Sequence, residues 1–159
     1  MRGRVEGLVR AGEWGGAFAI AAITVIVIFD VFARALGSPT LWAFEITGYL
    51  MAGAAVLGAG NVALLGEHFE VRLFLDWLPV RMVRIVDLFT MTLTTLFVLA
   101  VTWGAIGFIA QSLELGFRSP TLLQVPMYWP QSLVLLGLLL LSAASVIRLI
   151  RRIYAWRRA

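Results

Sequence analysis

The chain has 159 residues, of which 61% are hydrophobic and only 14% are charged, and its formal net charge is +4. A soluble domain carries about a quarter charged residues, so this composition excludes a soluble globular protein. The apolar residues instead fall in runs of roughly 18 or more, the length that spans a bilayer. All 13 basic residues are arginine and they flank these runs, which indicates membrane topology rather than nucleic-acid binding. The chain has no cysteine, which excludes disulfides and thiolate metal sites.

Four apolar runs predict an all-α integral membrane protein with a single membrane domain over residues 1–159. We expect the four transmembrane helices at residues 14–32, 41–65, 83–109 and 131–150. Counting arginines predicts the topology, because loops rich in arginine stay in the cytoplasm. With both termini and the middle loop on one side, only Arg34 and Arg118 fall on the other side. We therefore expect both termini inside.

The first two spans are joined by a short turn that charged residues flank. Asp30 and Arg34 are spaced i, i+4 and share one helical face, which favours an interfacial ion pair. Pro39 punctuates the turn, and Thr40 is a candidate N-cap of the second helix. Glu45 follows inside the apolar run, where a lone carboxylate is costly without a partner. We predict an outer-rim charge network in which Arg34 pairs with Glu45 across the turn and Asp30 is the third member.

One face of the second span consists of small residues at spacings of three and four. Its members are Gly48, Ala52, Ala55 and Ala59. Small residues at this spacing let another helix approach closely. The face serves either packing within this chain or docking of a different protein, and the sequence leaves both alternatives open.

Residues 67–79 are too charged to span the membrane and too apolar for a free loop. On a helical wheel they form an amphipathic helix, which predicts a segment lying in the interface and anchored by Trp77. Trp42, Tyr128 and Trp129 are further candidates for interfacial anchors, because tryptophan and tyrosine are enriched at headgroup level.

The longest connection covers residues 111–130 and contains three prolines. It is too apolar for a solvated linker, so we expect it to re-enter the membrane or to lie along the interface. Glu114 and Arg118 place charges on this outer side, where they are candidate contacts for a partner protein.

The sequence lacks the residue combinations of common catalytic and cofactor sites. His68 is the single histidine, so a bis-histidine haem site cannot form, and no set of nucleophile, base and orienting residue is visible around it. No charge falls near the middle of a span, which leaves a proton or ion path through this chain alone without support. We expect neither enzymatic activity nor a bound cofactor.

The order of these motifs resembles the small membrane subunit, the Q-type subunit, of tripartite ATP-independent periplasmic (TRAP) transporters. The likeness covers residues 12–152 and is carried by Arg34, Pro39, Trp42, Glu45, Gly58, Gly60, Glu67-His68, Val71, 73–79, 119–122 and 125–129. Two positions depart from the family pattern. Arg72 stands where the family often has an acidic residue, and Pro130 and Gly137 are farther apart than is usual.

The resemblance implies a scaffold subunit that braces a large membrane subunit, which holds the substrate and sodium sites. A periplasmic binding protein would deliver the substrate, typically an organic acid or a related carboxylate. The expected location is a bacterial-type inner membrane, with membrane lipid as the surroundings and no nucleic-acid partner.

Two other interpretations remain as alternatives. A membrane anchor of a redox complex would need axial histidines on two helices. A small self-associating four-helix transporter would need a carboxylate deep within a span, and Glu45 lies too close to the end of its helix.

Overall fold

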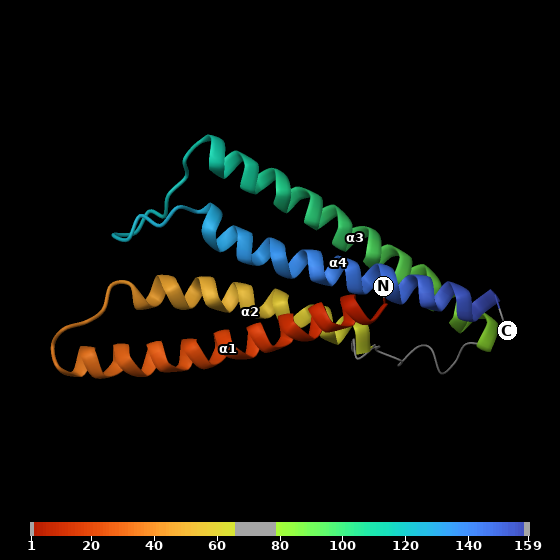
Figure 1. Ribbon diagram of the computed structural model, residues 1–159, viewed down its shortest axis with the longest axis horizontal. Coiled ribbons are helices and arrows are strands. Elements are labelled where there is room, and N and C mark those ends of the chain that lie inside the picture. The colour runs from red at the N-terminus through yellow and green to blue at the C-terminus, as the bar shows by residue number, and fades with distance from the viewer. Residues whose placement is uncertain (1, 66–78, 158–159) are drawn as a thin grey trace.

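The computed structural model describes residues 2–65 and 79–157, which form four α-helices (Figure 1). The helices are α1 (Arg2–Ala35), α2 (Ala43–Leu65), α3 (Val80–Glu114) and α4 (Tyr128–Arg157). Each contains a stretch that is long and apolar enough to cross a membrane. The prediction of an all-α protein with four such helices is therefore confirmed. The predicted interfacial segment, including Trp77, lies outside the described residues apart from Pro79.

Three of the helices extend well beyond the predicted spans. The 35 residues of α3 correspond to roughly 52 Å at a rise of 1.5 Å per residue. That length exceeds the hydrocarbon thickness of about 30 Å, so the helix tilts or protrudes. Hydropathy marks where an apolar run stops, but a helix continues past that point because arginine and glutamate are also good helix formers.

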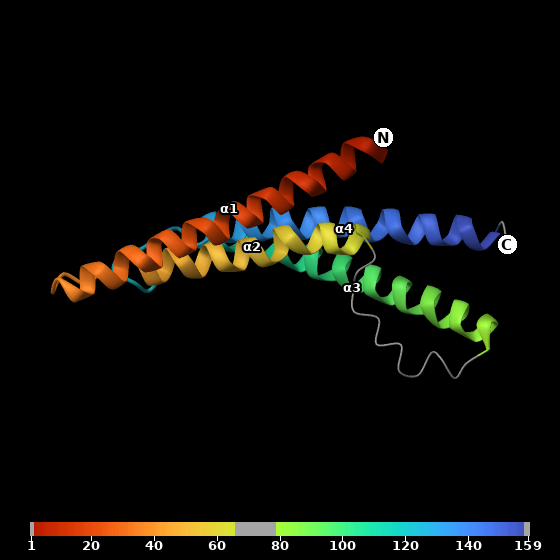
Figure 2. The same cartoon turned by 90° about the horizontal axis from the view of Figure 1, so that it is seen from below.

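The helices run alternately up and down. The two described ends of the chain lie at one end of the bundle (Figures 1 and 2). The loops at residues 36–42 and 115–127 lie at the opposite end, which we call the loop end. α1 packs on α2, as the short turn predicts, α2 packs on α4, and α4 packs on α3.

Among the described residues, α3 packs extensively only on α4. At the loop end α3 leans away from α2, and the loop at residues 115–127 extends from α3 back toward α2 (Figure 1). The bundle is therefore open on the side between α2 and α3.

Glycines set how closely the helices approach. A Cβ atom on Gly137 of α4 would lie 2.8 Å from the backbone carbon of Val56 on α2. A Cβ atom on Gly16 of α1 would lie 3.2 Å from the carbonyl oxygen of Ala54. Such contacts bring helix backbones together, and they stabilise membrane bundles because lipid supplies no hydrophobic driving force between helices.

Polar contacts add to the packing of α3 on α4. The hydroxyl groups of Thr102 and Ser142 lie 2.8 Å apart and are buried. Nearer the chain ends, Nη2 of Arg152 lies 2.5 Å from Oδ2 of Asp87. The Thr102 hydroxyl also donates to the carbonyl of Val98, so it remains satisfied within its own helix.

Candidate functional site

A buried carboxylate organises the loop end of the bundle. Glu45 lies in the first turn of α2, where the helix dipole favours a negative charge, and only 7% of its surface is exposed. Tyr49, one turn further along, donates a hydrogen bond to Oε1 of Glu45 at 2.5 Å. Thr121, from the loop between α3 and α4, donates to Oε2. Both carboxylate oxygens therefore accept hydrogen bonds, one from within α2 and one from the loop.

The loop that supplies Thr121 has its own internal structure. Its two limbs pair as Arg118 bridges to Pro126, and the amide of Met127 donates to the carbonyl of Phe117 at 2.9 Å. Gly116 has φ +63°, a left-handed conformation that glycine adopts without strain, and it turns the chain out of α3. The loop is thus a short paired excursion that Glu45 anchors to α2.

This loop is shorter than the predicted connection at residues 111–130. α3 continues to Glu114 and α4 begins at Tyr128, so the irregular part covers only residues 115–127. Pro130 lies in the first turn of α4, where its missing amide proton costs nothing. A proline there is compatible with helix, so the irregular connection is shorter than residues 111–130.

A second carboxylate joins the end of α1 to the turn before α2. Oδ2 of Asp30 accepts a hydrogen bond from Nε of Arg34 at 2.7 Å. Oδ1 accepts from the amide of Thr40 at 3.2 Å and also from its hydroxyl group. Thr40 is therefore occupied with Asp30, and the prediction that it caps α2 was wrong, since α2 begins three residues later at Ala43.

The predicted charge network divides into these two separate clusters. Arg34 pairs with Asp30, and the side chain of Arg34 is 57% exposed. Among the described side chains Glu45 bonds only to hydroxyl groups, so the predicted pair between Arg34 and Glu45 was wrong. The physical reason is orientation, because Glu45 faces the α3–α4 loop while α1 packs on another side of α2.

Sequence spacing accounts for only part of the Glu45 cluster. Tyr49 lies at i+4 from Glu45, a spacing that places the two on one helical face. Thr121 is 76 residues away in the chain, and no local pattern connects it to Glu45. The role of Thr121 in holding the loop was therefore missed, and its only local signal was a pair of hydroxyl residues, Ser119 and Thr121, on either side of Pro120.

The predicted small-residue face of α2 is uncovered in the bundle. Gly48, Ala52 and Ala55 are exposed, Ala59 is half-buried, and a Cβ atom on Gly48 would meet nothing within 4 Å. Internal packing uses a neighbouring side of the helix, where Gly53 meets α4. The sequence left two alternatives open for this face. The first, packing within the chain, does not occur in the described part of the structure.

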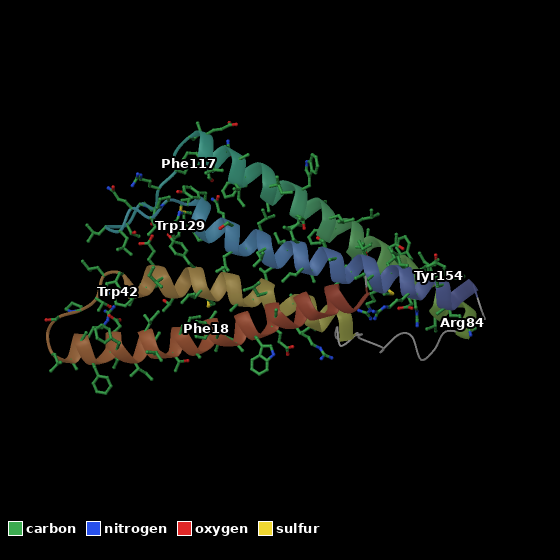
Figure 3. All side chains as sticks on the ribbon, viewed as in Figure 1. Phe18, Trp42, Arg84, Phe117, Trp129 and Tyr154 are labelled. Atoms are coloured by element: carbon green, nitrogen blue, oxygen red, sulfur yellow. The ribbon has the colours of Figure 1, made fainter. Side chains whose placement is uncertain are left out.

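The candidate anchors of the described region lie at the loop end. Trp42 packs against Phe29 of α1, with ring centroids 6.2 Å apart. Trp129 is 65% exposed at the start of α4, beside the half-buried Tyr128 (Figure 3). Aromatic side chains at this level suit the membrane interface.

The two other charged candidates also lie at this end. Glu114 ends α3 and Arg118 follows in the loop, and both are exposed. Neither forms an ion pair within residues 2–65 and 79–157. Two charges of opposite sign are therefore presented on the surface of the loop end.

These features define a multi-pass membrane protein in which two carboxylates, Glu45 and Asp30, tie loops to helices. Within the described ranges no group of three or more His, Cys, Asp or Glu side chains is placed to hold a metal ion.

Residues 23–155 match the family model described as "Tripartite ATP-independent periplasmic transporters, DctQ component". The match covers most of the chain, so the chain belongs to the DctQ family and is a small membrane component of a TRAP transporter, as the resemblance predicted. The family is not catalytic, and the chain is not an enzyme. A search of curated proteins gave no match.

Proposed function

We propose that the chain is a scaffold subunit that braces the large transport subunit of its TRAP system, and that the small-residue face of α2 is where the two subunits meet. The observation that carries this proposal is the exposure of Gly48, Ala52 and Ala55, on a side of α2 where a Cβ atom on Gly48 would meet nothing within 4 Å. A face of this kind lets the backbone of a partner helix approach as closely as Gly137 lets α4 approach α2.

The contrast with the lipid-facing surface supports a protein partner at this face. The exposed surfaces of α1 and α3 carry large apolar side chains, such as Phe18 and Trp103, which are 75% and 80% exposed. On α2 the small residues lie beside two exposed large side chains, Phe44 and Met51. Large side chains of this kind fill space among lipid tails. A flat row of glycine and alanine forms few contacts with disordered tails and many with a fitted helix, because close contact is what van der Waals packing rewards.

The remaining parts of the proposal rest on family membership and on the arginine distribution. The chain would lie in the inner membrane with both termini in the cytoplasm, which places the loop end in the periplasm. Glu114 and Arg118 would then be available to a periplasmic binding protein that delivers an organic acid or a related carboxylate. The substrate and sodium sites would lie in the large subunit.

Co-purification tests the docking face. The tagged chain is expressed with its large subunit, and the yield of complex is compared for wild type, Ala55→Trp and Ala21→Trp. Ala21 is an exposed alanine on α1, so it controls for adding an indole to the membrane surface. We expect Ala55→Trp to lower the yield of complex about tenfold or more, equivalent to at least ~1.4 kcal/mol.

Separate melting curves of the isolated variants distinguish lost assembly from lost folding, and both variants should melt like wild type. An unchanged complex with Ala55→Trp would contradict the proposal. A complex lost only with Ala21→Trp would place the docking face on α1 instead.

A further inference from the structure

The open side of the bundle contains an apolar cavity near the loop end. It has a volume of about 270 Å³. Tyr49 and Ala52 of α2 form one wall, Ala105 and Ile109 of α3 form the other, and Val134 of α4 forms part of the floor. The cavity therefore occupies the gap between two helices that do not pack on each other.

The loop between α3 and α4 reaches this cavity through its last residue. Met127, the last residue of the loop, lines the cavity, and the hydroxyl group of Tyr49 lies 4.0 Å from its sulfur atom. The same Tyr49 holds Glu45, so the anchoring of the loop and the shape of the cavity depend on one side chain.

A polar group on the cavity wall lacks a partner. Gln131 lines the cavity near the start of α4, and its Oε1 atom is buried without a hydrogen-bond partner within the described ranges. Buried amide oxygens are nearly always bonded, so this wall is short of one donor.

The charges at the loop end leave one cation unmatched. Arg34 is paired with Asp30, whereas Arg118 forms no ion pair with another described residue. Arg118 bridges to Pro126 and follows Phe117, whose carbonyl bonds to the cavity residue Met127, so it belongs to the loop that reaches the cavity.

We propose that this cavity and Arg118 together form a binding site for one phospholipid, with an acyl segment between α2 and α3 and the phosphate group at Arg118. Two apolar walls suit an acyl segment. Arg118, which has no ion-pair partner among the described residues and lies in the loop that ends in the cavity residue Met127, suits the phosphate group. The lipid belongs to the leaflet on the side of the loop end. Ala52 also belongs to the docking face of α2, and Arg118 is also the candidate contact for the binding protein, so a bound lipid would border both surfaces.

The size of the cavity favours an acyl chain over a protein helix. The lining residues on α3 run from Ala105 to Ile109, about 6 Å at 1.5 Å per residue. A docked helix is roughly 10 Å wide and would need a groove several turns long. The volume also lies just below the ~300 Å³ at which ordinary small-molecule sites begin, which suits part of a chain.

Native mass spectrometry of the purified full-length chain tests the site. The protein is stripped of lipid with detergent and titrated with phosphatidylglycerol, with a diacylglycerol of the same chains, and with inorganic phosphate. We expect one phosphatidylglycerol per chain to be retained, with weaker retention of diacylglycerol and none of phosphate.

Filling the cavity should release the lipid. Ala105→Phe places a ring in the cavity, and Ala110→Phe adds the same ring at an exposed position of the same helix. We expect Ala105→Phe to weaken retention about tenfold, equivalent to ~1.4 kcal/mol, and Ala110→Phe to leave it unchanged. Ala105→Leu gives a smaller loss and serves if Ala105→Phe does not fold.

The phosphate contact has its own variants. Arg118→Gln should weaken retention of phosphatidylglycerol but not of diacylglycerol, while Arg118→Lys restores most of it and Arg34→Gln does not alter it. Equal retention by the Ala105 and Ala110 variants would overturn the site, and equal retention of both lipids by wild type would overturn the assignment of a phospholipid. Loss of the bound lipid when the large subunit is added would show that a partner helix takes the cavity in the transporter, which also overturns the proposal.

Discussion

Replacing Gly137 by alanine tests whether the close approach of α2 and α4 holds the bundle together. The new methyl group would lie 2.8 Å from the backbone carbon and from the Cβ atom of Val56, and 2.9 Å from the amide nitrogen of Leu57. Optimal contacts between carbon atoms are about 3.5–4.0 Å, so the methyl group overlaps backbone atoms that cannot rotate away. The two helices must separate along their shared length.

The expected cost follows from overpacking and from helix propensity. Overpacking of a well-packed interior costs about 1–3 kcal/mol. Alanine in place of glycine stabilises a helix by up to ~1 kcal/mol. A comparison with wild type alone would therefore mix this gain with the cost of overpacking. Gly104→Ala supplies the matched control, because a Cβ atom on Gly104 of α3 would meet nothing within 4 Å. The propensity gain then cancels, and the difference between the two variants isolates the overlap at about 1–3 kcal/mol.

Thermal unfolding in detergent, followed by the far-ultraviolet circular dichroism of the helices, measures the difference. One kcal/mol shifts Tm by about 2–4 °C for a chain of this size, so Gly137→Ala should melt roughly 2–12 °C below Gly104→Ala. Gly53→Ala should fall between them, because its new methyl group meets the side chain of Leu133, which can move. Equal Tm values for Gly137→Ala and Gly104→Ala would refute the reasoning that backbone contact at Gly137 sets the packing of α2 on α4.

Three further changes test individual polar contacts. Asp87→Asn removes the ion pair between α3 and α4 and should lower the free energy of unfolding by at most about 1 kcal/mol, since the arginine partner is half exposed; an equal loss at low and high salt would argue against an ionic contact. Ser142→Ala removes the buried hydroxyl contact with α3 and should cost about 0.6 kcal/mol in the same melt, whereas a loss above about 2 kcal/mol would indicate a role beyond this bond. In a double-mutant cycle, Glu45→Gln and Thr121→Val should show less-than-additive losses of Tm, because the two residues share one hydrogen bond. Glu45→Gln and Arg34→Gln should show additive losses, because Arg34 pairs with Asp30 instead. The reverse pattern would support a contact between Arg34 and Glu45 across the turn.

Much of the fold follows directly from the sequence. Apolar runs define four helices because only a helix satisfies its backbone within lipid, and the short turn around Pro39 makes α1 and α2 neighbours. The helix ends were less accurate. α3 begins at Val80 and continues to Glu114, because charged residues at an interface end the apolar pattern without ending the helix.

The candidate site was predicted in its parts but not in its connections. Burial of a carboxylate within an apolar run identified Glu45 as a residue that needs partners. The nearest cation in the sequence, Arg34, was the obvious candidate, yet the partners are the hydroxyl groups of Tyr49 and Thr121, and Thr121 comes from the loop between α3 and α4. Such a contact depends on which way α3 leans and on how the loop folds, and neither property has a local signal in the sequence.

The sequence also did not predict which side of α2 packs inside the bundle, and the physical reason differs from that for the Glu45 contacts. In a soluble helix the apolar side faces the interior, so the pattern itself selects the buried face. In a membrane both the interior and the surroundings are apolar, and α2 carries small residues on more than one side. Gly53 and Gly48 are then equivalent in the sequence, although Gly53 meets α4 and Gly48 meets nothing within 4 Å. In the structure α4 covers the side of α2 that contains Gly53. The side that contains Gly48 is uncovered, so another helix can approach it closely.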